Sequence, residues 1–476
     1  MTKTLWTAVG VLLVCGSLVA QDVEQRLRDL ESRAARADGL ATRVHELEGR
    51  LQTYEAADQS AALEASIAAL SERQPAAGTV TARKASAITL GGQFRMRGEA
   101  RSPFNYASTS TLIVPDNIFA LMRTRINVDA RVADNVRVFA ELQDSRYLGE
   151  EGSVTADTAG VDLHQGFAEI EKIFGSNFTA RLGRTELSLW NQRLVSPLDW
   201  HMVGRAWDGL LVSGTQGDFD IAGGWHVVRD DMAPTPAATA NTDHLEWAAA
   251  TFKGLKDQQL GAAFFWLEAA SGGLSMGTAT LHGEGKCDGF DWSADAAWQS
   301  GLNGALKIEA YALAATAGYT FDGDLKPRVS AEWTFGSGDS DGAANGKFET
   351  FNPLYSFGHY YQGFMDLFSW KNGTDMALRA EIKPADGWST ELAFHGFWLD
   401  TTNDAWYGAT GGVIRPASAG ASDQLGYEMD LSAKYTFAKN TVLWFGYSRF
   451  FAGDFVDATG ASDDSDWIWA QLTATF

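Results

Sequence analysis

The sequence predicts an all-β protein, an antiparallel transmembrane β-barrel of about eighteen strands preceded by an N-terminal α-helical coiled coil. Apolar and polar residues alternate with a period of two from residue 88 onward. The alternating segments are about 10 to 14 residues long, which suits a tilted strand that crosses a bilayer, whereas soluble strands average about 5 to 6. The last alternating segment runs to the final residue, Phe476.

The first twenty residues have the pattern of a secretory signal peptide, and we expect it to span residues 1–20. Lys3 supplies a positive charge, residues 5–19 form an apolar run, and Ala20 is a suitable last residue before cleavage. An uncleaved signal anchor is the alternative. Cys15 follows Val14 instead of a small residue, so we expect no lipid attachment. Cleavage would leave Cys287 as a single thiol without an internal disulfide partner.

Residues 21–73 have the heptad spacing of a coiled-coil stalk, with a discontinuity near residue 38. Apolar residues step by four and three, with charged residues between them. These apolar positions are Val23, Leu27, Leu30, Ala34, Ala37, Leu40, Val44, Leu47, Leu51, Tyr54, Leu63, Ile67 and Leu70. A single helix lying on the body of the protein is the alternative. Residues 74–87 read as a linker.

Residues 88–476 contain the strands of the predicted barrel. We expect strands to start near residues 88, 117, 134, 161, 177, 206, 218, 243, 258, 274, 288, 306, 326, 374, 388, 423, 440 and 465. An even number of strands fits a closed bacterial barrel. Closure lets a sheet in lipid satisfy its edge hydrogen bonds, so the apolar positions should face lipid and the charged positions a water-filled lumen.

Composition is consistent with an exported barrel in the bacterial outer membrane, with outer-membrane lipid as a partner. The net charge of −22 argues against nucleic acid as a partner. Tryptophan (17) and glycine (49) are frequent while proline (10) is scarce, which favours strands and tight turns. After residue 20, no apolar run is long enough for a transmembrane helix.

Arginines are concentrated in the first half of the predicted barrel and are our candidates for pore-lining, anion-binding residues. A guanidinium group offers planar donors that suit carboxylate, sulfate or phosphate. The candidates are Arg95, Arg97, Arg123, Arg125, Arg131, Arg137, Arg181, Arg184, Arg193 and Arg205. The alternative is that they pair with acidic residues such as Asp129, Glu141, Glu332 and Glu381 and hold the barrel in shape.

One segment, residues 183–209, combines three arginines, three tryptophans and two aspartates. We expect the indoles to lie at the membrane boundary or to brace a loop that folds inward. The arginines and aspartates should then project into or beside a wet lumen. Asp199, Trp200, Trp207 and Asp208 belong to this motif.

The longest break in the strand pattern is residues 337–373, and we expect part of it to fold into or over the lumen as a gate. A loop that packs on the outer rim is the alternative. Asp339 and Asp341 lie among glycines and could bind calcium, although short Asp-Gly clusters are commonly turns. We expect no cofactor or bound metal and no enzymatic activity, because no nucleophile elbow or metal-ligand spacing occurs.

The run LGRTELSLWNQRLVSPLDWHMVGRAWDG resembles a motif of the alginate export family of outer-membrane porins. Its matching elements are Gly183-Arg184, Arg193-Leu194, Asp199-Trp200, Gly204-Arg205 and Trp207-Asp208-Gly209. The later run FNPLYSFGHYYQGFMDLFSWKN resembles that family's loop before a late strand. The resemblance covers about residues 88–476 and implies an eighteen-stranded monomeric barrel with an arginine-rich pore for an acidic polysaccharide. The coiled coil departs from that pattern.

Two functional interpretations therefore follow from the sequence. The first is an outer-membrane channel for passive transport of anionic solutes, saccharides or acidic polysaccharide. The second is a structural tether, in which a periplasmic coiled-coil stalk binds peptidoglycan or self-associates and the pore is secondary.

Overall fold

The computed structural model describes residues 87–103, 106, 117–150, 160–231, 241–342 and 344–476. They belong to a compact unit that spans residues 85–476. The predicted signal peptide, the coiled-coil stalk and all but the last residue of the linker lie outside the described residues. Within the described part, no helix is both long and apolar enough to cross a membrane.

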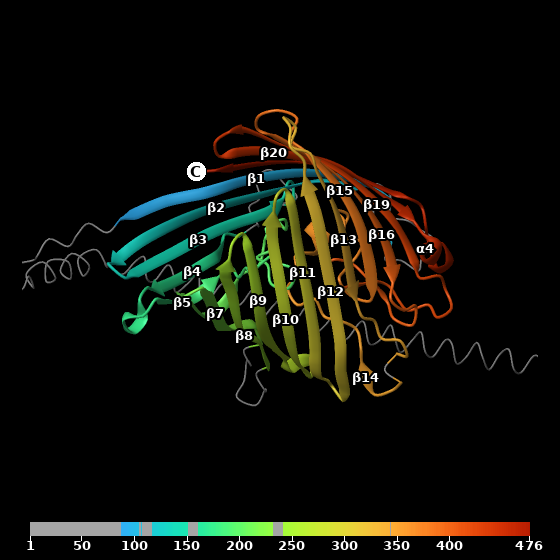
Figure 1. Ribbon diagram of the computed structural model, residues 1–476, viewed down its shortest axis with the longest axis horizontal. Coiled ribbons are helices and arrows are strands. Elements are labelled where there is room, and N and C mark those ends of the chain that lie inside the picture. The colour runs from blue at the N-terminus through green and yellow to red at the C-terminus, as the bar shows by residue number, and fades with distance from the viewer. Residues whose placement is uncertain (1–86, 104–105, 107–116, 151–159, 232–240, 343) are drawn as a thin grey trace, which may run out of the picture. The chain divides into compact units, whose positions relative to one another are not determined.

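Eighteen strands of the described chain form one closed antiparallel barrel (Figure 1). Each strand pairs with its neighbours along the chain, and β1 pairs with β21 to close the ring, from Gln93↔Thr475 to Ser102↔Asp466. The barrel strands are β1 (Ile88–Ser102), β2 (Asn117–Ala133), β3 (Val136–Tyr147), β4 (Asp162–Ile170), β5 (Phe178–Thr185), β6 (Trp207–Gln216), β7 (Phe219–Asp231), β8 (Asn241–Leu255), β9 (Gln258–Ala269), β10 (Leu274–Cys287), β11 (Phe290–Asn303), β12 (Leu306–Thr320), β13 (Arg328–Gly336), β15 (Gly373–Ile382), β16 (Trp388–Leu399), β19 (Gln424–Ala438), β20 (Thr441–Ala452) and β21 (Ser465–Thr475).

The remaining elements are short and lie in the connections between barrel strands. They are η1 (Ile173–Gly175), η2 (Ala270–Gly272), β14 (Lys347–Phe348), α3 (Gly358–Tyr361), β17 (Trp406–Tyr407), β18 (Val413–Arg415) and α4 (Asp454–Thr459). The predicted all-β barrel of about eighteen strands is confirmed. Each of the eighteen barrel strands begins within two residues of its predicted start.

The two faces of the wall differ as the alternating pattern predicts. On β1, the side chains of Arg95 and Arg97 point inward and are each 5% exposed, whereas Met96 between them is 40% exposed. Leu182, on β5, and Trp298, on β11, are among the exposed apolar side chains of the outer wall. An apolar outer wall suits a lipid environment, because lipid does not hydrate polar side chains.

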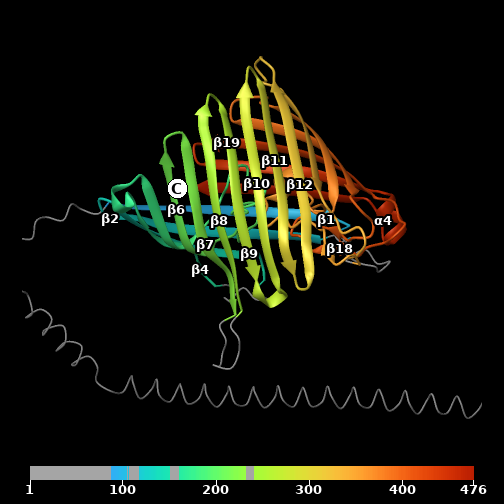
Figure 2. The same cartoon turned by 60° about the horizontal axis from the view of Figure 1, so that its bottom comes forward.

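The two ends of the barrel also differ (Figure 2). At one end, which we call the short-turn end, strands are joined by connections such as residues 134–135, 217–218 and 439–440. The opposite end, the loop end, carries the long connections, including residues 186–206 and 337–372. In outer-membrane barrels the short turns face the periplasm and the long loops face outward.

The inner wall is more apolar than the sequence pattern predicts. Leu245 on β8, Phe265 on β9 and Ala312 on β12 are buried in one cluster with Leu194 and Trp370 of the long loops. A second buried cluster joins inward side chains of β16, β19, β20 and β21 to loop residues. The expected water-filled lumen is therefore partly replaced by a packed core, because the loops bring apolar side chains inside the barrel.

Candidate pore and the loops that cross it

Two long connections carry the residues that meet inside the barrel. The first lumen loop is residues 186–206, between β5 and β6, and the second lumen loop is residues 337–372, between β13 and β15. Trp190, Gln192 and Leu198 of the first loop have positive φ angles of 48°, 66° and 52°. Residues other than glycine seldom adopt this left-handed backbone conformation, and each one that does costs about 1–3 kcal/mol. The surrounding contacts therefore have to hold this loop in its shape.

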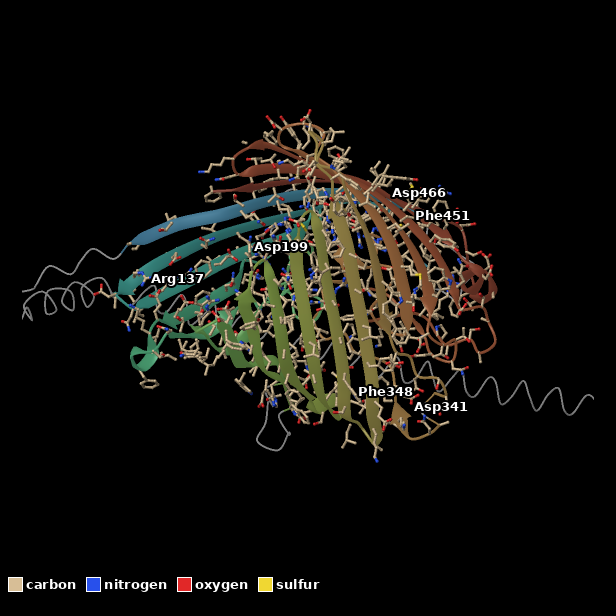
Figure 3. The ribbon with its side chains drawn as sticks, in the orientation of Figure 1. Arg137, Asp199, Asp341, Phe348, Phe451 and Asp466 are labelled. Carbon is tan, nitrogen blue, oxygen red and sulfur yellow. The ribbon has the colours of Figure 1, made fainter. Side chains whose placement is uncertain are left out.

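Asp199 is the point at which the first lumen loop joins the arginines of β1 and β2. Its carboxylate accepts a hydrogen bond from Arg95 Nη2 at 2.8 Å and another from Arg123 Nη2 at 2.7 Å. Arg95 also donates to the backbone oxygen of Asp199, and Arg123 to that of His201 at 3.2 Å. Figure 3 shows Asp199 amid the barrel strands. One carboxylate thus connects two neighbouring strands to the loop.

Two further arginines of the same strands hold the loop on either side of Asp199. Arg97 donates to the backbone oxygen of Trp200 at 2.9 Å, and its guanidinium lies 3.9 Å from the indole centroid. Arg125 Nη1 lies 3.1 Å from a Glu186 carboxylate oxygen, and Arg125 Nη2 donates to the backbone oxygen of Val203 at 3.3 Å. Together with Arg95 and Arg123, these side chains form what we call the arginine clamp.

The arginines of the clamp are buried, whereas side chains that line a pore would be exposed to water. Arg95, Arg97, Arg123 and Arg125 are 5%, 5%, 0% and 6% exposed. Their donors face loop carbonyls and carboxylates, so the geometry matches the alternative interpretation in which arginines hold the structure in shape. The sequence pattern correctly placed these side chains on the inner face, but it could not show that a loop returns to cover them.

Three other candidate arginines lie on the inner wall toward the short-turn end. Arg137 pairs with Asp129 at 2.8 Å, and Arg181 pairs with Glu169 at 2.6 Å. Arg131 pairs with Glu171 at 2.7 Å, and its side chain is 43% exposed. These three side chains reach water more readily than the clamp does, but each of the three has a carboxylate partner.

Arg184 lies on the outer face of the barrel, which corrects its predicted place in the pore. It occupies the same face of β5 as Leu182, which is 64% exposed, whereas the next residue, Thr185, is 1% exposed. Arg184 pairs across the strands with Asp208 at 2.7 Å. Gly183, between Leu182 and Arg184, has a φ of 129°, and a Cβ at that position would lie 2.3 Å from the backbone oxygen of Gly166.

The last two candidate arginines belong to the first lumen loop and contact the second. Arg193 is 4% exposed, pairs with Glu332 of β13 at 2.7 Å and lies 3.7 Å from the ring centroid of Tyr361. Arg205 donates to the backbone oxygens of Tyr355 at 2.6 Å and Ser356 at 3.0 Å. Both arginines therefore connect the two loops.

Backbone hydrogen bonds continue this junction. Tyr355 N donates to Leu194 O at 2.8 Å, and Phe357 N donates to Gln192 O at 3.0 Å. An isolated parallel bridge pairs Val195 with Tyr355. The loops leave the wall at β5–β6 and β13–β15, which lie on nearly opposite sides of the eighteen-strand ring. The joined loops therefore form a bridge across the lumen, as predicted for part of the second loop.

The second lumen loop is also fixed to the far wall by carboxylates of β19. Met365 N donates to Glu428 Oε1 at 2.8 Å, and Phe364 N donates to Asp430 Oδ2 at 3.3 Å. Gly363 has a φ of 85°, and a Cβ there would lie 2.6 Å from Glu428 Oε1. Glycine at this position allows the loop to approach the wall closely enough for both bonds.

The motif tryptophans brace the bridge from within and do not lie at the membrane boundary. Trp200 is 8% exposed and stacks on His359 of the second loop, with ring centroids 4.1 Å apart. Trp207 is 3% exposed and packs against Tyr355 at 5.4 Å. Of the two interpretations that the sequence allowed, bracing of an inward-folded loop is the one that the indole contacts show.

The sequence profile of the alginate export family matches residues 86–470, which is most of the chain and nearly the whole barrel. The chain belongs to the alginate export family. A comparison with curated proteins found no match. Family membership and the closed barrel with its apolar outer wall place this protein among the outer-membrane channels.

Solved structures of outer-membrane proteins from Pseudomonas aeruginosa have a similar fold. OprD is 11% identical with a TM-score of 0.57, and the alignment covers 82% of this chain and 94% of that one. OccK8 (OprE) is 13% identical with a TM-score of 0.55, with 82% and 98% covered. At this level of identity the likeness concerns the fold alone.

In this alginate export family member, a polar chamber lies beside the bridge toward the short-turn end. One cavity of about 660 Å³ is lined by residues of β8–β13 and β15 together with Asn191, Tyr360 and Tyr361 of the loops. Tyr360 and Arg328 also line a neighbouring cavity of about 300 Å³ with Lys326, Lys383 and Lys434. These lysines were not among the predicted site residues, because they occur singly in strands and turns without a recognisable motif.

A cluster of metal-ligating types inside the described barrel also escaped the sequence analysis. Glu141, His164 and Glu186 place their ligand atoms within 4.8 Å of one another. Arg125 Nη1 lies 3.6 Å from Glu141 and 3.1 Å from Glu186, so a guanidinium already supplies positive charge there.

Asp339 and Asp341, which the sequence offered as calcium ligands or as a turn, lie at the loop end. Asp341 N donates to Asp339 Oδ1 at 3.3 Å, which is the geometry of a turn.

Proposed function

We propose that this alginate export family member is a passive outer-membrane channel for anionic solutes, with the acidic polysaccharide of the family's name as one candidate substrate. The observation that carries the proposal is the positive charge of the smaller cavity beside the bridge. Lys326, Lys383 and Lys434 are exposed there, and none has a carboxylate within ion-pair distance among the described residues.

In this proposal, the anion-attracting charge lies in a different part of the barrel from the predicted arginine row. The clamp arginines are held by the first lumen loop and by neighbouring strand side chains, whereas the lysines of the smaller cavity have no ion-pair partner among the described residues, and Lys434 lies over the ring of Trp444. An excess of positive over negative side chains in a walled cavity raises the local concentration of anions even when the whole chain is acidic. Binding and release at such sites require no chemical step.

Uptake into liposomes tests the proposal. Purified full-length protein in liposomes should admit a small organic anion such as gluconate faster than a neutral sugar of similar size, and added salt should reduce the difference by screening. Equal rates for both solutes would contradict anion preference. Liposomes that admit neither solute, despite folded protein, would contradict a channel altogether.

The alternative function, a tether between outer membrane and cell wall, depends on residues 21–73, which lie outside the described residues. Within the barrel, the contacts described here concern the bridge and the chamber. We therefore propose the channel as the main function, with outer-membrane lipid around the wall and anionic or saccharide solutes as partners.

A further inference from the structure

We propose that the chamber binds one small organic anion that carries a ring, between Tyr360 and a group of lysines, and that this small molecule is the solute selected by the channel. The inference rests on the proposed channel function and narrows its substrate class from polymers to single molecules. Its basis is the packing of the bridge together with the residues that line the smaller cavity.

The first argument concerns size. The bridge crosses the lumen, and a packed apolar cluster lies against the walls on each side of it. A polymer chain would have to displace Arg193 from Glu332 and Tyr361 or break the backbone bonds between the loops. The cavities of about 660 and 300 Å³ fall within the range of roughly 300–1,000 Å³ typical for small-molecule sites.

The second argument concerns charge. Six charged side chains line the smaller cavity: Lys326, Arg328, Glu381, Lys383, Glu391 and Lys434. Arg328 pairs with Glu381, as well as with Asp291 at 2.7 Å. Three lysines then face a single remaining carboxylate, that of Glu391. This excess of positive charge fits one carboxylate or phosphate group, and the hydroxyls of Ser389 and Ser432 add uncharged donors.

The third argument concerns the ring. Tyr360 is 50% exposed although it lies in α3 inside the barrel, and it lines both the larger and the smaller cavity. Its ring is supported by Phe357 at a centroid distance of 6.2 Å and by Tyr361 at 5.0 Å. A supported, exposed phenol offers a flat surface for a sugar or aromatic ring. The lysines lie on the same cavity and would hold the anionic group of that ring.

Block of ion current through the purified full-length channel in a planar bilayer tests this site. The probes are free galacturonate and benzoate, which have a ring and a carboxylate, against acetate without a ring and galactose without a charge. A uronate oligomer is the polymer probe. We expect galacturonate and benzoate to block the current at lower concentration than acetate or galactose. The difference between galacturonate and benzoate should show whether sugar or aromatic rings are preferred.

Substitutions test whether the block of ion current arises at the smaller cavity. Lys383→Gln with Lys434→Gln should weaken block by the better ring carboxylate roughly ten-fold, the size of a lost charged hydrogen bond. Tyr360→Ala should weaken it as well, while Tyr360→Phe keeps the ring and should keep the block. Lys439→Gln, an exposed lysine in the turn at residues 439–440, is the matched control and should change nothing.

Two results would overturn the inference while leaving the channel intact: block by the oligomer alone, or block by ring carboxylates that the lysine and Tyr360 substitutions leave unchanged. Absence of current would instead contradict the proposed channel. In that case, quenching of tryptophan fluorescence by benzoate in the wild type and in the Lys383→Gln/Lys434→Gln variant still tests the site, and equal quenching in both would overturn it.

Discussion

Asp199 is only partly buried, yet it connects two of the most buried arginines in the barrel. Its side chain is 57% exposed, whereas those of Arg95 and Arg123 are 6% and 0% exposed. Partial burial alone would raise the pKa of Asp199, but the two guanidinium groups hold that pKa well below its usual range. At neutral pH the carboxylate is therefore charged and compensates buried positive charge.

Replacing this carboxylate should loosen the first lumen loop. Asp199→Asn leaves Arg95 and Arg123 without their shared counter-charge, and we expect a loss of about 1–3 kcal/mol in the free energy of unfolding, discounted because Asp199 is half-exposed. Thermal unfolding of the purified barrel measures the change. Asp208→Asn is the matched control, because its partner Arg184 lies on the outer face, and we expect less than about 1 kcal/mol there. Equal losses would contradict a special role for Asp199.

The same ion pairs predict how stability changes with pH. Because the folded pKa of Asp199 is depressed, its contribution is fully present above the unfolded value of about 3.9 and is lost as pH falls through the folded pKa. Lowering pH from 7 to 5 should thus leave this contribution unchanged, with weakening only in stronger acid. The difference in melting temperature between wild type and Asp199→Asn should stay constant from pH 7 to 5 and become smaller between about pH 4 and pH 3. Curves that stay parallel would contradict this.

At the scale of elements, the two lumen loops act as one bridge whose arginines are structural. Arg193→Gln with Arg205→Gln removes the contacts to Glu332, Tyr361 and the backbone oxygen of Tyr355. Glu332 then keeps Arg379 at 3.4 Å and the hydroxyl of Thr316 at 2.9 Å as partners. We expect a loss of about 3–5 kcal/mol in unfolding free energy, as for broken buried pairs.

The selectivity of the same double variant separates the two possible roles of these arginines. Because Arg193 is buried in an ion pair and Arg205 bonds to the backbone oxygens of Tyr355 and Ser356, ion selectivity should stay close to that of the wild type while the melting temperature falls. Arg184→Gln, on the outer face, is the control for loss of one arginine and should change neither quantity appreciably. A large drop in anion preference without loss of stability would show that Arg193 and Arg205 line the conducting path.

The sequence was sufficient to predict the strands and an inward fold of part of the second lumen loop, but not the contacts that join the two loops into a bridge. Strand positions follow from local alternation, as on β1, where Met96 lies between two inward arginines. The inward return of residues 186–206 depends on contacts between residues about a hundred positions apart, such as Asp199 with Arg95. Local periodicity carries no information on such pairs, so the clamp could not be distinguished from a pore lining. Arg184 has the same parity on β5 as the exposed Leu182 and the opposite parity to the inward Arg181, so the alternation itself places it on the outer face.

At the scale of the whole molecule, the barrel combines a lipid-compatible outer wall with a lumen that is partly core and partly chamber. The bridge gathers the apolar side chains, the arginine clamp and the motif tryptophans. The exposed lysines remain on the cavity wall near the short-turn end. The bridge would thus be stable on its own contacts, while a small solute meets lysines that have no ion-pair partner among the described residues. That separation of roles is the central claim of the proposed mechanism.

The reversal potential of the purified full-length protein in a planar bilayer, measured under a potassium chloride gradient, tests that claim most directly. If solutes pass the unpaired lysines of the chamber, chloride should carry more of the current than potassium, and the reversal potential should have the sign of an anion-selective channel. The preference should weaken as salt is raised at both sides, because screening shortens the reach of the lysine charges. A cation-selective potential, or no current through protein shown to be folded, would contradict the claim.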